Sequence, residues 1–336
     1  MEPVRMGVVG LRFGASVCEG LVQQTQAPVT IVGVTDLDRE KAQRVSETCG
    51  LPVMDSLEAM LADPNIEAIA LYTPPAGRAR LIRQIVAAGK DVMTTKPFEV
   101  DPAEALAVLR EAKQAGRVVH LNSPNMRPFG EMAPIHEWVE AGRLGRLTLA
   151  QANTWVNYHE QADGGWYDDP VQCPVAPLFR IGIYALNSLL ALFPEPETVQ
   201  VTTSRLQTGR PTPDNAAATI RCRGGAIINI MASFTVGGPE RYKDAKMIAG
   251  EKGAIYYNWG PVTGTPTLAL YTEAGLEERT PCGHAGEYDW EFFARRVRGL
   301  ETADVTTPEQ IVRGMRVVAA MAQAEREGGT AEVAPT

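Results

Sequence analysis

Residues 9–16 read Val-Gly-Leu-Arg-Phe-Gly-Ala-Ser and follow a short apolar run. A glycine turn of the form G-x-G-x-x-G/A between a strand and a helix brings a dinucleotide pyrophosphate close to the backbone at a helix N-terminus. Gly10 and Ala15 fit the first and third positions, but Arg12 occupies the second. The stretch therefore predicts a phosphate-binding turn with an altered centre.

Arg12 replaces the glycine that normally lets the backbone approach the pyrophosphate. Gly14 is expected to absorb the resulting rearrangement of the turn. Two roles stay open for the arginine. It pairs with a phosphate or stacks on adenine, or it is a solvated side chain on a surface loop.

The segments around this turn alternate between strand-like and helix-like patterns. Strands are expected at residues 5–9, 30–35, 68–72, 91–94 and 118–122, with helix-like segments between them. Such alternation builds a parallel sheet with helices on both faces. Residues 1–123 are therefore predicted to form a doubly wound, Rossmann-type domain.

The second strand ends in Asp36, a position from which a carboxylate can bind the adenine-side ribose. Because a carboxylate repels a 2′-phosphate, NAD is preferred to NADP. The alternative is that Asp36 only caps the helix that begins near Asp38.

Composition excludes several classes of function. The net charge of −8 argues against a general nucleic-acid binder, and no apolar run approaches a membrane span. The five cysteines lack C-x-x-C spacing and the four histidines lack metal-ligand spacing, so no metal is expected. A reduced, cytoplasmic protein is the expectation, and His159 is the only histidine placed near the predicted cleft.

Two loops follow the third and fourth predicted strands, where open α/β sheets bind ligands. They are Thr-Pro-Pro-Ala-Gly-Arg at 73–78 and Thr-Lys-Pro-Phe at 95–98. Lys96 precedes a proline, which disfavours a helical conformation. A lysine fixed there could supply positive charge to a reacting oxygen.

Together, the glycine turn, Asp36 and these loops resemble the Gfo/Idh/MocA family, named for glucose–fructose oxidoreductase and inositol dehydrogenase. The resemblance continues through residues 140–147, 225–234, 249–257 and 287–300. This chain departs from the family pattern in having Arg78 where T-P-x-x-x-H has histidine, and Thr95 where E-K-P has glutamate.

The second half, residues 124–336, contains short alternating runs separated by glycine and proline. This pattern predicts a large, mostly antiparallel sheet with one face packed on helices, closed by a C-terminal helix at 308–325. The family resemblance implies that such sheets pair between subunits, so a homodimer or homotetramer is expected.

An apolar segment at residues 176–194 carries one polar stripe, formed by Arg180, Tyr184 and Asn187. The family commonly places a catalytic D-x-x-x-H here, so the resemblance puts Arg180 in place of the aspartate and Tyr184 in place of the histidine. Residues 174–176 occupy the place of the familiar Gly-Gly-Gly.

The resemblance and the chemistry together make Lys96 and Tyr184 the predicted acid/base pair. They would serve hydride transfer between nicotinamide and a secondary alcohol or ketone of a sugar, polyol or sugar acid. Arg180 needs an anionic partner, which is either Asp168 or Asp169 or a carboxylate or phosphate of the substrate.

The predicted contact residues form two groups. Those for the dinucleotide are Gly10, Arg12, Phe13, Gly14, Asp36, Thr73, Pro74 and Lys96. Those for the substrate are Arg127, Trp166, Arg180 and Asn187. Two other functions stay open: elimination or glycoside hydrolysis assisted by bound NAD, and NAD binding without catalysis.

Overall fold

The computed structural model describes residues 1–335 except residues 25, 159, 238–242, 260–264, 282 and 303–305. His159 therefore lies outside the described residues. The chain divides into two units, each described by itself. The first consists of Met1–Glu99, Ala103–Asn122 and Tyr288–Pro308, and the second of Val100–Pro102, Ser123–Glu287 and Glu309–Thr336. This division gives residues 288–308 to the first unit, whereas the predicted boundary at residue 123 gives them to the second.

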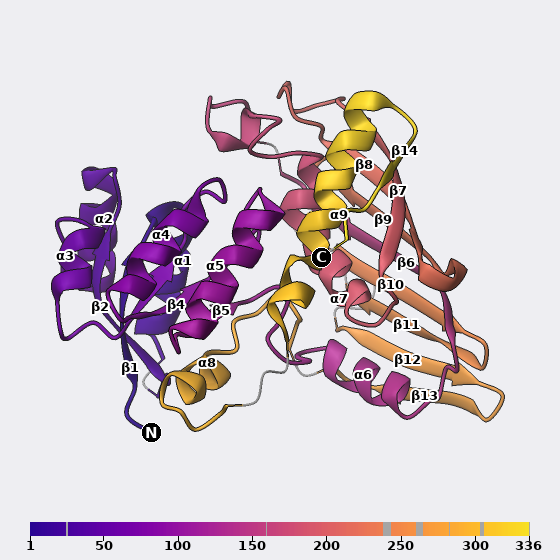
Figure 1. Ribbon diagram of the computed structural model, residues 1–336, viewed down its shortest axis with the longest axis horizontal. Coiled ribbons are helices and arrows are strands. Elements are labelled where there is room, and N and C mark those ends of the chain that lie inside the picture. Colours follow the sequence, from indigo (N-terminus) through magenta and orange to yellow (C-terminus); the bar gives the residue numbers. More distant parts are fainter. Residues whose placement is uncertain are drawn as a thin grey trace. The chain divides into compact units, whose positions relative to one another are not determined.

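The first unit contains a five-stranded parallel sheet in the order β2-β1-β3-β4-β5 (Figure 1). Its strands are β1 (Val4–Val9), β2 (Val29–Thr35), β3 (Ala68–Leu71), β4 (Asp91–Thr94) and β5 (Val119–Leu121). Its helices are α1 (Leu11–Val22), α2 (Arg39–Cys49), α3 (Leu57–Ala62), α4 (Arg78–Ala87), α5 (Pro102–Gln114) and α8 (Trp290–Val297). The predicted doubly wound fold is confirmed.

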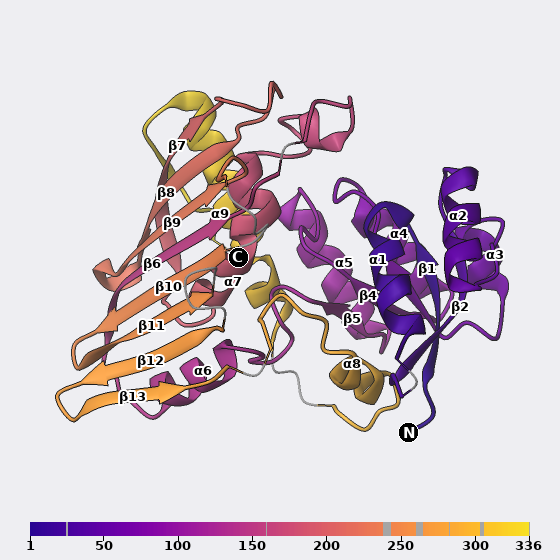
Figure 2. The same ribbon diagram turned by 180° about the vertical axis from the view of Figure 1, so that it is seen from behind.

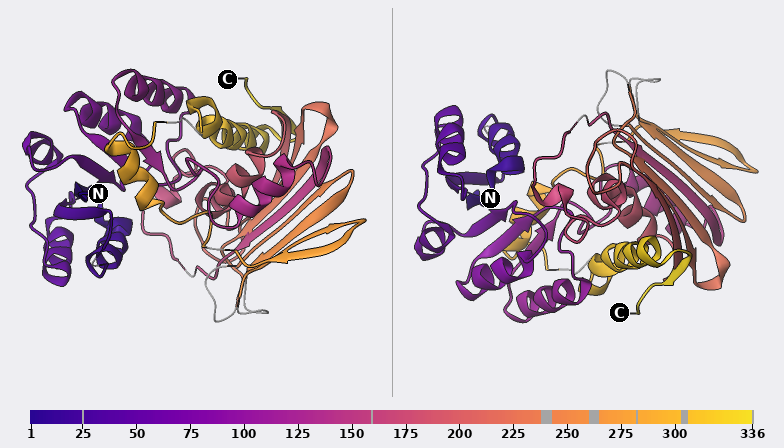
Figure 3. Two further views of the ribbon diagram at one scale, coloured as in Figure 1. Left: turned by 90° about the horizontal axis from the view of Figure 1, so that it is seen from below. Right: turned by 90° about the horizontal axis from the view of Figure 1, so that it is seen from above.

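Local sequence explains these elements. The strands β3 and β4 are buried along their whole length because helices cover both faces of the sheet, with α1 and α2 on one face and α4 and α5 on the other (Figure 3). Asp38 caps α2, since its side chain accepts the N–H of Lys41, and Gly50 ends that helix in the left-handed conformation.

The second unit is built on a nine-stranded sheet in the order β13-β12-β11-β10-β6-β9-β8-β7-β14 (Figure 2). Among the described residues all neighbours are antiparallel except β6 and β9. The strands are β6 (Leu147–Trp155), β7 (Pro196–Ser204), β8 (Asn215–Cys222), β9 (Ile227–Ser233), β10 (Lys243–Gly250), β11 (Gly253–Trp259), β12 (Thr267–Thr272), β13 (Gly275–Arg279) and β14 (Thr330–Glu332). The predicted antiparallel character is confirmed, and β13 and β14 are two strands that the sequence analysis missed.

One face of this sheet is covered by α6 (Met132–Glu140), α7 (Ile183–Leu190) and α9 (Pro308–Glu327) (Figure 3). The helices and the sheet share one apolar core, which includes Trp138, Phe179 and Ile230. On the other face, Met231, Tyr256 and Tyr271 are exposed. The alternation of buried and exposed residues along each strand is that of a sheet packed on one side only.

None of the described helices is both long enough and apolar enough to cross a membrane.

Candidate active site

The glycine turn follows β1 and is closed by the end of β3. Gly10 has φ = 89°, and a Cβ at this residue would lie 2.8 Å from the carbonyl carbon and oxygen of Tyr72. Only glycine fits this turn without displacing the backbone. The helix α1 begins at the next residue and carries no acidic side chain in its own first turn, so its positive end faces the turn.

Gly14 lies inside α1 and is buried. The prediction that it rearranges the turn is wrong, because its conformation is helical. A Cβ there would lie 3.0 Å from Cδ2 of Tyr72 and 3.1 Å from Cγ1 of Val8. Gly14 instead lets α1 pack closely on β1, which is a role that the third glycine of the motif often has.

Asp36 ties the end of β2 to the glycine turn. Its carboxylate accepts the N–H of Leu11 at 2.6 Å and the N–H of Asp38 at 2.9 Å. The helix α2 is capped by Asp38, not by Asp36, so the alternative role considered for Asp36 is wrong. The remaining lone pairs of the carboxylate are available to hydroxyl donors.

Arg12 and Phe13 form the exposed start of α1. The ring of Phe13 meets the ring of Tyr72 edge-on, with centroids 5.6 Å apart. The role of Arg12 toward a pyrophosphate stays a prediction.

Arg78 holds together the two loops that follow β3 and β4. Its buried guanidinium donates to the carbonyls of Thr95, Pro97, Phe98 and Thr73. Burial lowers the pKa of Arg78 to about 10, which leaves the side chain charged at neutral pH. Sequence comparison marks this residue only as a departure from histidine and gives no indication of these bonds.

Lys96 lies between two of the residues whose carbonyls Arg78 binds. Its own N–H donates to Oδ1 of Asn122 at 3.2 Å, and the Thr95 hydroxyl donates to the same oxygen at 3.2 Å. Asn122 is buried at the end of β5. The backbone around Lys96 is therefore held between Arg78 of α4 and Asn122, which follows β5, and the side chain of Lys96 is half-buried. A polar residue directly after a buried strand is the signal that could have indicated Asn122.

Two further residues complete this edge of the first unit. Glu99 is buried, and its carboxylate accepts the N–H groups of Gly77 and Ala79 at the start of α4. Among the described residues the buried Oγ1 of Thr73 has no hydrogen-bond partner, while Pro74 beside it is exposed. A buried hydroxyl without a partner is an indication that a ligand supplies one.

The residues present fit a bound dinucleotide. The turn at Gly10 has no room for a Cβ, the N-terminus of α1 follows it directly, and Asp36 and Thr73 offer polar atoms at the same edge of the sheet. These features define the first unit as a dinucleotide-binding unit.

In the second unit, Arg180 lies on a π-helical turn (Leu178–Gly182) that precedes α7. Its guanidinium pairs with both carboxylate oxygens of Glu160, at 2.8 and 3.1 Å, and lies 3.5 Å above the centroid of the Tyr167 ring. Burial opposes its charge, but Glu160 outweighs burial and holds the pKa of Arg180 above its usual value.

The protein partner of Arg180 is thus Glu160, and the prediction of Asp168 or Asp169 is wrong. Asp168 lies 3.3 Å from the buried Arg210, which also donates to the carbonyl of Gln161. These two arginines anchor the segment that contains Trp166, whose ring centroid is 4.2 Å from that of Tyr167. Whether Arg180 and Trp166 also contact a substrate stays a prediction.

The polar stripe predicted along one helix is divided by the π-helical turn. Its wider hydrogen-bond spacing separates Arg180 from the face of α7 that carries Tyr184 and Asn187. Asn187 is buried, and its amide donates to Oγ of Ser123 at 3.0 Å. Tyr184 is half-buried, and its ring meets His284 edge-on at 6.4 Å between centroids.

Val175 stands where the family has a glycine run, and its φ is 42°. A buried, β-branched residue in this region is strained, at a cost of about 1–3 kcal/mol. The backbone therefore keeps a glycine-like conformation before the π-helical turn although the glycine itself is absent.

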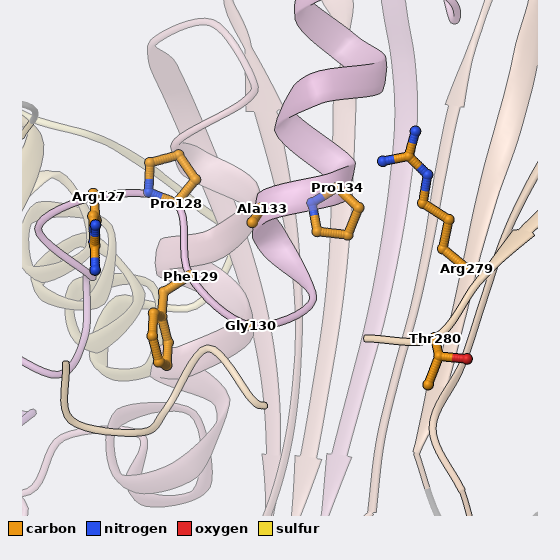
Figure 4. A pocket seen from close by; sticks show the side chains of 8 residues that line it. All are labelled: Arg127, Pro128, Phe129, Gly130, Ala133, Pro134, Arg279 and Thr280. Atoms are coloured by element: carbon orange, nitrogen blue, oxygen red, sulfur yellow. The ribbon is translucent and has the colours of Figure 1, made fainter. Parts of the chain in front are cut away.

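Arg127 lines an open depression together with Phe129, Pro134, Arg279 and others. Figure 4 shows the guanidinium groups of Arg127 and Arg279 on opposite sides of it. Arg279 is paired with Glu137 at 2.6 Å. A substrate contact of Arg127 stays a prediction.

The comparisons agree with this description. Residues 4–123 match the model of the GFO_IDH_MocA oxidoreductase family with an NAD-binding Rossmann fold, and residues 132–256 match the GFO/IDH/MocA C-terminal domain. The chain belongs to the Gfo/Idh/MocA oxidoreductase family, and its first unit is the NAD-binding one.

The chain is similar to several known proteins at low sequence identity. The chain is 25% identical to a trans-1,2-dihydrobenzene-1,2-diol dehydrogenase of Oryctolagus cuniculus over 66% of this chain and 65% of the relative. It is 25% identical to galactose 1-dehydrogenase of Pseudomonas fluorescens, over 70% and 71% of the two chains. A solved levoglucosan dehydrogenase in complex with NADH and levoglucosan has a TM-score of 0.80 at 16% identity, covering 100% of both chains. The chain spans 42–65% of the length of several curated relatives that it matches.

Replacing Asp36 by serine should shift the cofactor preference from NAD toward NADP. The change removes a charged acceptor for the ribose diol, worth about 1.5–3 kcal/mol or about 10–150-fold in affinity, and also removes the repulsion of a 2′-phosphate. Lys41, whose Nζ lies 3.7 Å from Asp36, would then face the phosphate. Fluorescence titration with NADH and NADPH measures the shift.

Asp38→Ser is the matched control and should leave both affinities unchanged, because serine also caps a helix. Tighter binding of NADH by the Asp36→Ser variant would contradict the assignment.

Proposed function

We propose that the protein is an NAD-dependent dehydrogenase acting on a secondary alcohol of a sugar, polyol or sugar acid, with Lys96 and Tyr184 as the acid/base pair. The observation that carries this proposal is the fixation of Lys96 at the carboxyl edge of the NAD-binding sheet, by Arg78 on one side and Asn122 on the other. The names of the relatives, dehydrogenases for a dihydrodiol, galactose and levoglucosan, support the same class of reaction.

Bound NAD would supply the hydride acceptor. Gly10, Asp36 and Thr73 would hold its phosphate and ribose groups. Oxidation of an alcohol also requires a base, and Tyr184 takes the hydroxyl proton in this proposal. Because a phenol has an ordinary pKa of about 10, it needs a nearby positive charge to act as phenolate near neutrality, and the Lys96 ammonium supplies it.

The proposal is tested by incubating the purified protein with NAD and a panel of sugars, polyols and sugar acids. Nicotinamide absorbance reports net reduction of the cofactor, and chromatography identifies the product. Formation of NADH with one equivalent of ketone or lactone is expected. Products formed with catalytic NAD and no net reduction would instead support elimination or hydrolysis. Binding of NAD without turnover of any compound would support a non-catalytic protein.

Arg180 offers a test of the substrate's charge. If its role is to anchor Glu160, Arg180→Met should lower the free energy of unfolding by about 1–3 kcal/mol and change the KM of neutral and acidic substrates alike. If it binds an anionic group, the KM should rise for acidic substrates only. Arg205→Met, which removes a half-exposed pair with Glu325, is the control for loss of one arginine.

The exposed face of the nine-stranded sheet supports a homo-oligomer. Met231, Tyr256 and Tyr271 lie on the face that the helices leave uncovered, where a second copy of the same face would bury them. We expect a dimer or tetramer by light scattering, and a monomer at micromolar concentration would contradict this expectation.

A further inference from the structure

A buried cluster of charged side chains lies in the second unit and has no part in the proposed proton transfer. Nζ of Lys246 is 2.9 Å from Oε1 of Glu131 and also contacts the carboxylate of Asp244. All three side chains are almost completely excluded from solvent. His284 borders the cluster, with its Nε2 3.5 Å from Oδ2 of Asp244.

The ammonium group of Lys246 lies between the two carboxylates and contacts both of them. Burial alone would raise the pKa of Asp244, but Lys246 and His284 outweigh burial and hold that pKa below its usual value. Burial likewise opposes the charge of Lys246, yet Asp244 and Glu131 keep its pKa raised. The carboxylate of Asp244 thus lies between the Lys246 ammonium and the His284 ring.

The cluster anchors the turn that contains His284. Oε2 of Glu131 accepts the N–H of Ala285 at 2.7 Å. Gly130 packs against the same backbone so tightly that a Cβ there would lie 2.6 Å from the carbonyl carbon of His284. The buried carboxylate of Glu131 and the backbone of Gly130 therefore hold this turn in place.

The imidazole of His284 is fixed in turn. Its Nδ1 accepts the N–H of Gly286 at 2.9 Å, so a neutral ring carries its proton on Nε2, the nitrogen that faces Asp244. Trp259 lies against the same ring, with centroids 5.0 Å apart. Neither the tautomer nor the orientation of the ring is free to change without breaking one of these contacts.

The other side of this turn meets Tyr184. The rings of His284 and Tyr184 form an edge-to-face contact with an interplanar angle of 73°. A Cβ at Gly286 would lie 2.9 Å from Cε1 of Tyr184 and 3.0 Å from Nδ1 of His284. Gly286 is thus a glycine because its backbone fits between the two rings.

We propose that His284 and Gly286 are positioning residues that fix the phenol ring of Tyr184, with the cluster of Glu131, Lys246 and Asp244 as their rigid support. This inference rests on the proposed role of Tyr184 as the acid/base. A phenol that is displaced by about 1 Å from its reacting position can cost about 10²-fold in rate, so precise support of the ring has a kinetic consequence.

The test uses the full-length protein labelled with 3-fluorotyrosine and followed by ¹⁹F NMR. The signal of Tyr184 is identified by its loss in Tyr184→Phe. In His284→Ala this signal should shift and broaden, and kcat should fall by about 10²-fold while the KM for NAD stays constant. His284→Gln, whose amide can still reach Asp244, should recover part of both. His136→Ala, a half-buried histidine on α6, is the matched control and should change neither.

Gly286→Ala provides a second route, because its methyl group must displace the Tyr184 ring directly. It decides the question if His284→Ala fails to fold. An unchanged Tyr184 signal in a folded His284→Ala or Gly286→Ala protein would overturn the proposal. Loss of ring order in these variants, together with full activity of Tyr184→Phe, would confirm the positioning contact and refute the proposed function of Tyr184.

Discussion

Replacing Tyr184 by phenylalanine is expected to lower kcat by about 10²–10⁴-fold and to leave the dissociation constant for NADH unchanged. The variant keeps the ring that packs against His284 but loses the hydroxyl that takes the substrate proton. Steady-state kinetics on a substrate found in the screen, together with NADH fluorescence titration, measure the two effects. Tyr256→Phe removes a hydroxyl from the exposed sheet face and should retain full kcat.

A double variant sharpens this result. If Tyr184 and Lys96 act as one acid/base unit, the double variant Lys96→Met/Tyr184→Phe should have a kcat close to that of the slower single variant. The reason is that the effects of groups that act together are not additive. Multiplicative losses would indicate two independent roles. A Tyr184→Phe enzyme with kcat within a few-fold of the original would exclude the tyrosine as the acid/base.

Replacing Arg78 by methionine should destabilise the first unit by about 3 kcal/mol or more and should also lower activity. The change leaves several buried carbonyls without a donor, and each unsatisfied group costs about 1–3 kcal/mol. Because two of those carbonyls flank Lys96, the position of the lysine should change as well. Urea denaturation gives the stability, and kinetics of the folded fraction give the activity.

Arg83→Met is the control for Arg78 on the same helix. Arg83 pairs with Glu104 and Glu111 near the surface, and exposed pairs contribute about 1 kcal/mol or less. Equal effects of the two substitutions would show that Arg78 has no special role. If Arg78→His, which introduces the residue usual in the family, retains its stability, fewer N–H donors are sufficient to hold the two loops together.

Much of the first unit could be predicted from the sequence because its signals are local. A buried strand, a glycine turn and a terminal Asp36 follow one another within a short stretch, and each has a backbone reason for its residue type. The bonds of Arg78 could not be predicted, because they join carbonyls on two separate loops. A backbone carbonyl leaves no mark in the sequence of the loop that presents it.

The second unit shows a different limit. A helical period of 3.6 residues places Arg180 above Tyr184, but Arg180 lies within a π-helical turn that interrupts this period, and its guanidinium pairs with Glu160. Nothing in the apolar segment marks that turn, and Glu160 lies in a long irregular connection. The sheet, in contrast, was predictable because its alternation of buried and exposed residues is regular.

The NAD-binding unit is assembled from segments that lie far apart in the chain, and this has a consequence for folding during synthesis. The helix α8 comes from near the end of the chain, yet Phe293 and Ala294 belong to the same core as β1 and β3, and Phe292 and Phe293 meet the ring of His120. During synthesis on the ribosome, the amino-terminal strands can therefore pair early, but their core stays incomplete until residues near 297 have emerged. The NAD-binding unit therefore starts to fold first but completes its core late in synthesis.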